Sequence, residues 1–257
     1  MTETVQSEQT VPQRTTFTPP TRFAVPGRID AGQAAALWQR AVIAEIRRET
    51  ANASTFRFAV PGWQGHLPGQ HLMLRLTAED GYAAQRHYSL ASAPDDSGHI
   101  ELTLDHVVDG EVSGFLHTEA RVGDEVEMRG PLSGFFAWPG DRPALLLGAG
   151  SGVVPLMSMI RHHRQHELTV PLRLFVSART RGDLIYADEY GAETTPVLTR
   201  EGEHRRLAAD HLAPCFTEGA PQWEAYVCGS NSFAEHASQL LVGLGQPVDR
   251  IRIERFG

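Results

Sequence analysis

The spacing of apolar residues changes at Trp138-Pro139-Gly140-Asp141, and this change constrains the fold more than any other feature of the sequence. Before it, short apolar-rich runs are separated by Gly, Pro and Asp turn signals, a pattern typical of a small antiparallel barrel. After it, apolar strands alternate with helical segments, which predicts a parallel sheet with helices on both faces. We therefore expect two domains, an antiparallel six-stranded β-barrel over residues 38–139 and an α/β Rossmann-like domain over residues 140–257.

The elements expected in the first domain are six strands and one helix. The strands are 41–46, 55–60, 71–76, 86–91, 100–106 and 125–128, and the helix is 112–119. The second domain should contain strands 144–147, 172–177, 195–199, 226–228 and 251–254, with helices from the glycine turn to about residue 163 and over 232–244. A further helix is expected to start at Asp183–Tyr186. Residues 1–37 are expected to form a flexible tail, with a helical turn or two over residues 31–39.

Composition excludes several classes of protein. The 41% hydrophobic and 21% charged residues are typical of a soluble globular protein, and the N-terminus lacks the features of a secretory signal. We therefore expect a cytoplasmic protein without a membrane span. The net charge of −8 disfavours nucleic-acid binding. All 23 basic residues are arginine, which excludes a P-loop lysine and a Schiff base.

No metal site is expected. Two cysteines, Cys215 and Cys228, are too few for an iron–sulfur cluster or a Cys-rich zinc site. His162, His163 and His166 lie near the end of a predicted helix, where the helix dipole favours histidine without any metal.

The run Arg86-His87-Tyr88-Ser89-Leu90 is the first candidate ligand-binding motif. In a strand, Arg86 and Tyr88 share one face, while His87 and Ser89 share the other. A guanidinium and a flat ring on one face suit a ligand with a phosphate and a planar ring system, such as a flavin nucleotide. The alternative is a surface arginine beside a packed tyrosine.

A second candidate is Gly148-Ala149-Gly150-Ser151-Gly152, which follows an apolar strand and opens a helix. Glycines allow a pyrophosphate to approach the backbone closely, and the helix N-terminus presents free N–H groups to it. The pattern G-x-G-x-G, followed by Pro155, differs from the usual G-x-G-x-x-G. Its position between strand and helix nevertheless favours a dinucleotide site.

Arginines follow the second and third strands of this domain. Ser177 and Arg179 stand where sites for NAD often carry an acidic residue, and Arg200, Arg205 and Arg206 come after the next strand. Arginine suits the 2′-phosphate of NADPH, so NADPH is expected in preference to NADH. The alternative is that these are solvated loop arginines.

Several motifs, in order over residues 38–257, resemble those of the ferredoxin–NADP⁺ reductase superfamily. Arg86–Ser89 resembles the R-x-Y-S motif, which implies Arg86 on a flavin phosphate, Tyr88 against the flavin ring and Ser89 near flavin N5. Gly110-Glu111-Val112-Ser113 resembles the G-x-x-S segment, where a helix N-terminus and Ser113 meet the flavin diphosphate. This second likeness favours FAD over FMN.

Three further motifs belong to the same resemblance. Gly148–Pro155 is similar to the NAD(P)-binding turn, and Cys228-Gly229-Ser230 is similar to the C-G-x segment, which implies Cys228 beside nicotinamide C4. Glu254-Arg255-Phe256 resembles the E-x-F/Y ending, whose aromatic residue covers the flavin. The sequence departs from the superfamily in the Gly257 that follows the aromatic residue, and it has no cluster-carrying domain.

The resemblance implies a flavoprotein that takes hydride from NAD(P)H onto FAD. It would pass electrons to a separate acceptor, a protein such as a ferredoxin or an oxygenase component, or a small molecule. The alternatives are a free-flavin or quinone reductase and a non-catalytic nucleotide-binding subunit. The candidate catalytic residues are Ser89, Cys228, Glu254 and Phe256. The candidate cofactor-binding residues are Arg86, His87, Tyr88, Ser89, His106, Gly110, Val112, Ser113, Gly148, Gly150, Ser151, Gly152, Pro155, Ser177, Arg179, Arg200, Arg205, Cys228, Gly229 and Phe256.

Overall fold

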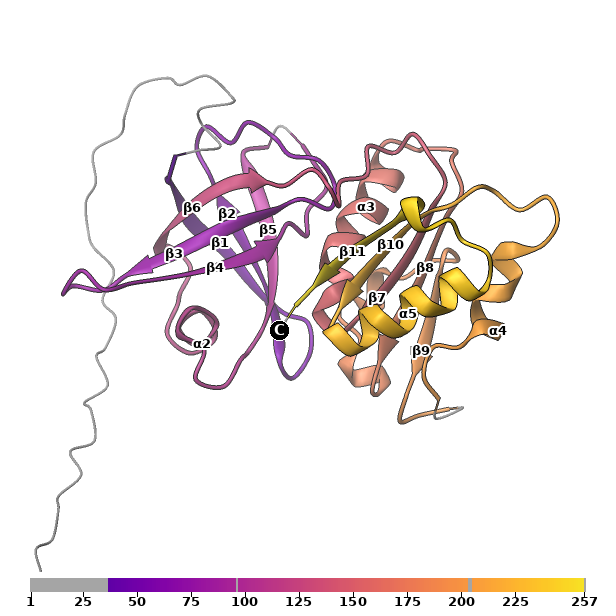
Figure 1. Ribbon diagram of the computed structural model, residues 1–257. Helices are drawn as coiled ribbons and strands as arrows, with labels where there is room; N and C mark the ends of the chain where they lie inside the picture. Colours follow the sequence, from indigo (N-terminus) through magenta and orange to yellow (C-terminus); the bar gives the residue numbers. More distant parts are fainter. Residues whose placement is uncertain (1–36, 96, 203–204, 257) are drawn as a thin grey trace, which may run out of the picture.

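The computed structural model describes residues 37–95, 97–202 and 205–256. A β-barrel and an α/β domain with a parallel sheet lie side by side (Figure 1). The predicted tail over residues 1–37 falls outside the described residues except for its last residue. Gln39 already belongs to the first strand, so the helical turn predicted over residues 31–39 is wrong at its end.

The barrel is a six-stranded antiparallel sheet in the order β4-β3-β6-β1-β2-β5. Its strands are β1 Gln39–Arg48, β2 Ala53–Ala59, β3 His71–Thr77, β4 Ala83–Ser89, β5 His99–Asp105 and β6 Glu125–Leu132. Alternate residues such as Leu72, Leu74 and Leu76 are buried in the barrel core. The helix α2, Glu111–Thr118, adds Val112 and Phe115 to this core.

The strand that carries Arg86–Ser89 ends earlier than the sequence predicts. β4 stops at Ser89, after which Leu90 leaves β3 and bridges Leu102 of β5. The amide of Ala91 then donates to the carbonyl of Glu101 at 2.8 Å. The chain changes its strand partner here because β4 and β5 are the two edges that must approach each other to close the barrel.

The second domain is a parallel five-stranded sheet in the order β11-β10-β7-β8-β9. Its strands are β7 Ala144–Ala149, β8 Leu172–Ala178, β9 Thr194–Leu198, β10 Glu224–Gly229 and β11 Ile251–Arg255. The helix α3, Val153–Gln165, packs on one face, and α5, Asn231–Gly243, packs on the other. The strand order reverses between β7 and β10, and such a switch point forms a ligand-binding crevice at the carboxyl ends of the strands.

The helix predicted to start at Asp183–Tyr186 is absent, and that prediction is wrong. Two short 3₁₀ turns, η2 Arg181–Asp183 and η3 Ala187–Glu189, take its place. Tyr186 between them has a φ of 64°, in the left-handed region that a right-handed helix cannot include. Other short helices connect the strands of this domain: η1 Gly150–Gly152, α4 Ala209–Leu212, η4 Ala213–Phe216 and η5 Val248–Arg250.

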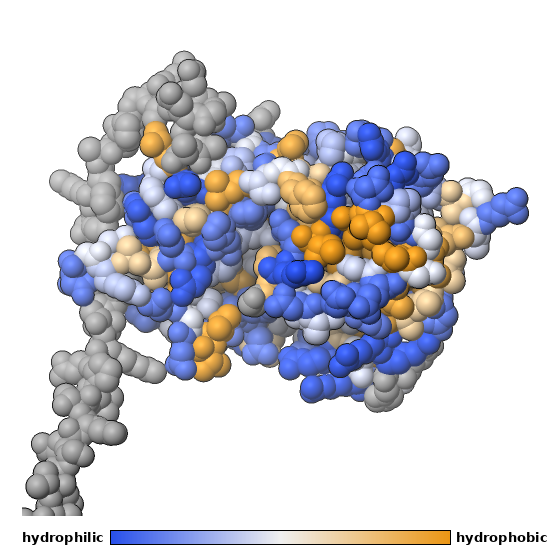
Figure 2. Space-filling model, viewed as in Figure 1, coloured by the Kyte–Doolittle hydropathy of each residue, from blue (hydrophilic) through white to orange (hydrophobic). Residues whose placement is uncertain are grey.

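The surface is mainly hydrophilic on the face that Figure 2 shows, with a group of apolar residues over the second domain. Val242 of α5 and Val248 of η5 are among the exposed apolar residues, with 49% and 70% of their surfaces accessible. Over the described part of the chain, no helix has both the length and the apolar character needed to cross a membrane.

Candidate functional site

The Arg86–Ser89 strand and the start of α2 lie side by side. A guanidinium nitrogen of Arg86, Nη2, lies 3.3 Å from Oε2 of Glu111, the first residue of α2. The register places Arg86 opposite Leu74 and Tyr88 opposite Leu72, so Arg86 and Tyr88 face the same way. The fold therefore brings the two flavin-type motifs to one place.

The turn before α2 is too tight for a side chain. A Cβ on Gly110 would lie 2.5 Å from Oγ of Ser113 and 3.0 Å from the carbonyl oxygen of Val107. No described side chain caps the N-terminus of α2, so its first N–H groups point outward without such a partner. Beside Arg86, these groups suit a phosphate.

Tyr88 and Ser89 present two different chemistries. Tyr88 packs against the barrel core, and burial raises its pKa to about 12, which keeps the phenol neutral. The Ser89 side chain is buried, and its hydroxyl oxygen has no hydrogen-bond partner among the described residues. An unpaired buried hydroxyl is costly, and a ligand acceptor placed there would satisfy it.

Glu254 of the second domain lies beside the barrel strand β3, next to the position of Ser89 on β4. His71 pairs with Ser89 across β3 and β4, and Nδ1 of His71 lies 3.7 Å from Oε1 of Glu254. His87 lies nearby, with its ring centroid 5.2 Å from that of His71. Ser89 and Glu254, far apart in the sequence, thus belong to one cluster with two histidines.

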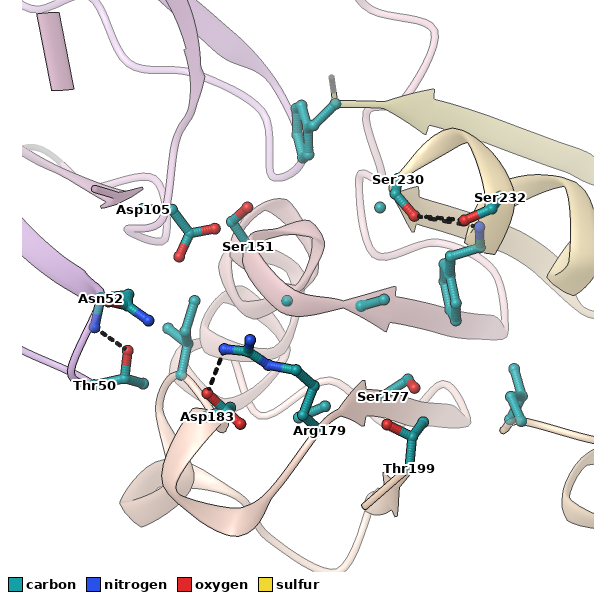
Figure 3. Close-up of a pocket in the computed structure, with 18 of the residues that line it drawn as sticks. Thr50, Asn52, Asp105, Ser151, Ser177, Arg179, Asp183, Thr199, Ser230 and Ser232 are labelled. Atoms are coloured by element: carbon teal, nitrogen blue, oxygen red, sulfur yellow. Dashed lines mark hydrogen bonds and ion pairs between the residues drawn. The ribbon is translucent and has the colours of Figure 1, made fainter. Parts of the chain in front are cut away.

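A cavity of about 700 Å³ lies between the carboxyl edge of the parallel sheet and the barrel, and none of the four residues of this cluster lines it. Figure 3 shows Ser151 of the second domain near Asp105 of the barrel, and Arg179 extending toward the side where Thr50 and Asn52 lie. The predicted site residues that line the cavity are His106, Gly150, Ser151, Ser177, Arg179, Gly229 and Phe256.

Other predicted residues support the cavity from beneath. Gly152 and Cys228 are buried, and a Cβ on Gly152 would lie 2.2 Å from the carbonyl oxygen of Cys228. A Cβ on Gly148 would lie 3.1 Å from Cα of Val153, and Pro155 is buried in the first turn of α3. The glycine turn therefore packs directly on the end of β10.

The end of β10 joins the end of β11. Cys228 is adjacent to Glu254 in register, and the amide of Phe256 donates to the carbonyl of Gly229 at 3.1 Å. Burial, and then the charge of Glu254, raise the pKa of the Cys228 thiol well above its usual value. Cys228 is consequently a neutral thiol at physiological pH.

The arginines predicted to bind the 2′-phosphate do not all reach the cavity. Arg179 and Arg206 line it. Arg205 instead forms an ion pair with Asp210 at 2.7 Å, and neither Arg205 nor Arg200 is among the described residues that form the cavity wall.

Arg179 has an acidic partner at the cavity. Its Nη2 lies 2.8 Å from Oδ1 of Asp183 (Figure 3). The other carboxylate oxygen of Asp183, Oδ2, accepts hydrogen bonds from the amide and hydroxyl of Thr180. The Thr180 hydroxyl, and then Arg179, lower the pKa of Asp183 and so keep it ionised. A phosphate bound by Arg179 has to compete with this carboxylate.

Sequence reasoning missed part of the cavity wall. The missed residues come from turns and helix starts that carry no motif, and only the fold brings them together: Thr50, Asn52, Asp105, Val108, Asp183, Ile185, Thr199, Leu207, Ser232, Phe233 and His236. One local signal existed, because Ser230 caps α5 by accepting a hydrogen bond from the amide of Phe233 and so marks a helix start at the cavity.

A barrel followed by a parallel sheet with a glycine turn at its switch point is the fold of many flavin- and pyridine-nucleotide-binding oxidoreductases. Residues 40–137 match the model of the oxidoreductase FAD-binding domain family. These residues form the barrel domain, which is thus similar to the FAD-binding domains of oxidoreductases.

Curated relatives are similar over most of this chain. The chain is 36% identical over 236 residues to the glycine betaine monooxygenase reductase subunit of Chromohalobacter salexigens, covering 83% of this chain and 62% of the relative. It is 32% identical over 218 residues to the propane 2-monooxygenase reductase component of Mycolicibacterium smegmatis, covering 76% of this chain and 60% of the relative. The chain thus spans about 60% of the length of these relatives.

Solved structures share the fold. A ferredoxin NADP⁺ reductase from Neisseria gonorrhoeae with bound FAD and NADP superimposes with a TM-score of 0.71 at 21% identity, covering 85% of this chain and 98% of that one. Phthalate dioxygenase reductase gives a TM-score of 0.71 at 18% identity, covering 86% of this chain and 68% of that one.

Proposed function

We propose that this chain is an NAD(P)H-dependent flavoprotein reductase that holds FAD between its barrel and its parallel-sheet domain. The observation that carries the proposal is the buried, unpaired hydroxyl of Ser89, which lies in one cluster with Glu254 of the other domain. A purely structural subunit has no use for an unsatisfied hydroxyl at a domain boundary. The relatives named as reductase subunits of monooxygenases support the same activity.

The residues present fit FAD. Arg86 and the N–H groups at the start of α2 would bind the diphosphate, with Ser113 as a further donor. Tyr88 offers an apolar ring surface to the flavin, and Ser89 offers its hydroxyl to an acceptor on the ring edge. Bound FAD supplies a centre that accepts hydride and gives up single electrons.

The cavity fits the coenzyme that supplies the hydride. Backbone N–H groups of Gly150 and Ser151 would bind its pyrophosphate at the start of α3. The neutral Cys228 thiol and Glu254 stand at the end of the sheet where the nicotinamide would enter, and Phe256 would exclude water from the flavin until it does. We propose NADPH as the preferred coenzyme, with Arg179 and Arg206 on its 2′-phosphate.

We further propose a separate redox protein as the electron acceptor, either ferredoxin-like or an oxygenase component. The support comes from the relatives, which are named as parts of monooxygenase systems. A quinone or free flavin is the rival acceptor. We further propose that this exchange takes place in the cytoplasm, on the composition described above.

The proposed activity predicts that purified protein reconstituted with FAD is yellow and that its flavin absorbance bleaches under anaerobic conditions when NADPH is added. The chain's two cofactor sites would lie next to each other, so a single turnover with NADPH should bleach the flavin absorbance completely. A preparation that binds FAD but keeps its absorbance with both NADPH and NADH would contradict the proposal. Steady-state rates with a ferredoxin, a quinone and free FMN then rank the three acceptors.

Substituting Arg179 with alanine is expected to weaken NADPH binding about tenfold or more and to leave NADH binding within twofold. A charge-assisted contact to a phosphate contributes about 1.5–3 kcal/mol, part of which the Asp183 pair already offsets. Arg200→Ala is the matched control, because Arg200 is an exposed loop arginine outside the cavity wall. Stopped-flow titration with each coenzyme measures the effect, and an equal loss for both coenzymes contradicts the proposed role.

A further inference from the structure

A polar joint links the two domains on the side of α3. It consists of Ser158 and Arg161 on α3 and Tyr186 in the second domain, which contact Ala91, Ser92, Glu101 and Thr103 of the barrel. We call this set of residues the α3 joint. It carries none of the cofactor-binding roles proposed above.

Arg161 is the centre of the α3 joint. Glu189, in its own domain, accepts two hydrogen bonds from Arg161 at 3.0 and 2.6 Å and so holds the guanidinium in one orientation. The remaining nitrogen, Nη1, reaches across the boundary to the carbonyl of Ala91 at 2.9 Å and to Glu101 at 3.1 Å. Burial opposes the charge on Arg161, but the hydrogen bonds and charge of Glu189 outweigh it and raise its pKa, so the residue stays charged.

Two neighbours add contacts with defined directions. The hydroxyl of Ser158, one turn before Arg161, donates to the carbonyl of Ser92 at 2.6 Å. The Arg161 guanidinium lies 4.7 Å from the ring centre of Tyr186. The hydroxyl of Tyr186 donates a hydrogen bond to Thr103, a buried residue of β5 in the barrel. The left-handed backbone of Tyr186 has a cost of roughly 1–3 kcal/mol, which this buried placement offsets.

The α3 joint is close to both cofactor motifs along the chain. The barrel segment that the α3 joint contacts, Ala91–Ser92, begins two residues after Ser89. Arg161 stands on the helix that begins just after Gly152, about 14 Å further along its axis. Each motif is thus connected to the joint by a short, well-packed piece of chain.

Apolar contacts alone do not set the relative position of two domains. Phe136 and Trp138 pack against the second domain, but apolar packing is non-directional and permits sliding. Hydride transfer requires the reacting atoms to approach to about 3–3.5 Å, and an error of about 1 Å can cost a hundredfold in rate. Hydrogen bonds are directional. The Arg161 guanidinium, which is hydrogen-bonded in both domains, therefore fixes the relative position that apolar packing leaves open.

From this arrangement we infer that Arg161 is a positioning residue, which sets the distance between the nicotinamide and flavin sites through the α3 joint. The inference rests on the proposed function, since it concerns the alignment of its two cofactors. It assigns to Arg161 an effect on hydride transfer without any contact to either cofactor.

The test compares Arg161→Met with Arg164→Met in the full-length, FAD-loaded protein. Methionine keeps much of the apolar length of the side chain in both variants. Arg164 lies on the same helix but donates to Glu189 and Glu193 within the second domain. Arg161→Met should slow flavin reduction by NAD(P)H about ten- to a hundredfold, while FAD content and the dissociation constant for NADP⁺ stay within twofold of wild type. Arg164→Met should leave all three unchanged.

A second readout does not depend on turnover. Amide hydrogen exchange of residues 91–92 should accelerate in Arg161→Met and stay at the wild-type rate in Arg164→Met. Tyr186→Phe, which removes a single hydroxyl, is the milder variant should Arg161→Met fail to fold, and it should slow reduction about three- to tenfold.

The outcomes separate the inference from the function that it rests on. Wild-type protein that neither coenzyme reduces would refute the proposed function, and the inference with it. Wild-type protein that is reduced, together with Arg161→Met or Tyr186→Phe reduced at the wild-type rate, would overturn the inference alone. Equal slowing in Arg161→Met and Arg164→Met would also overturn it, because it would indicate a general loss of stability.

Discussion

Replacing Gly152 with alanine is expected to lower the free energy of unfolding by about 3 kcal/mol and to abolish reduction by NAD(P)H. The new Cβ would lie 2.2 Å from the carbonyl oxygen of Cys228, 2.5 Å from its carbonyl carbon and 2.7 Å from the amide of Gly229. All three are backbone atoms, so no side chain can move aside, and overpacking of this kind costs about 1–3 kcal/mol or more. Urea unfolding of the variant, followed by circular dichroism, measures the change.

Gly150→Ala is the matched control in the same turn. Gly150 has a φ of 54°, but its new Cβ would meet no atom within 4 Å. Only the left-handed backbone opposes this substitution, at about 1–2 kcal/mol. Should Gly150→Ala prove as destabilising as Gly152→Ala, the direct packing of the turn on β10 would not be what requires glycine at position 152.

Replacing Ser89 with alanine is expected to slow hydride transfer about a hundred- to a thousandfold without reducing the stability of the FAD-free protein. Removal of one well-placed hydrogen-bond donor commonly costs this much in rate. The hydroxyl has no partner among the described residues, so its loss leaves no other buried group unsatisfied. Stopped-flow reduction gives the rate, and thermal unfolding of the FAD-free protein gives the stability.

Ser113→Ala is the control for Ser89→Ala. Ser113 accepts a hydrogen bond from the amide of Val107 at the start of α2, on the proposed diphosphate side of the site. This variant should bind FAD more weakly but, once saturated, should reduce at close to the wild-type rate. A Ser89→Ala protein that transfers hydride at the wild-type rate would rule out the role proposed for Ser89.

Much of the fold could be predicted because each strand carries its own pattern. The alternating Leu72, Leu74 and Leu76 predict a half-buried strand, and the uninterrupted apolar residues of β7 predict a central parallel one. The predicted elements differ from the observed ones mainly at their ends, by a few residues. Strand ends depend on hydrogen bonds to neighbouring strands, which the sequence of one strand does not contain.

The absent helix at Asp183–Tyr186 shows where local signals mislead. Thr180 and Asp183 form a capping box, which is the usual start of a helix. Burial of Leu184 and Ile185, and the contact of Tyr186 with Thr103 of the barrel, favour a turn instead. Tertiary packing overrides propensity here, and the packing partner lies in a different domain.

The site could be predicted where its residues are consecutive and not where they come from separate turns. Arg86–Ser89 and Gly148–Gly152 are single runs with a recognisable order. Thr50 and Asn52 line the cavity only because the β1–β2 turn faces the second domain. Similarly, nothing local in the sequence distinguishes Arg206, which lines the cavity, from Arg205, which pairs with Asp210.

The place of β6 in the barrel determines when this protein can begin to fold during its synthesis. β6 lies between β1 and β3, so the sheet stays open, with two unpaired edges inside it, until Leu132 has left the ribosome. Translation adds about 5–20 residues per second, which leaves a few seconds between the completion of β6 and the appearance of α3. During that time the nascent barrel exposes to solvent the surface of Ala91 and Trp138, which the second domain later covers.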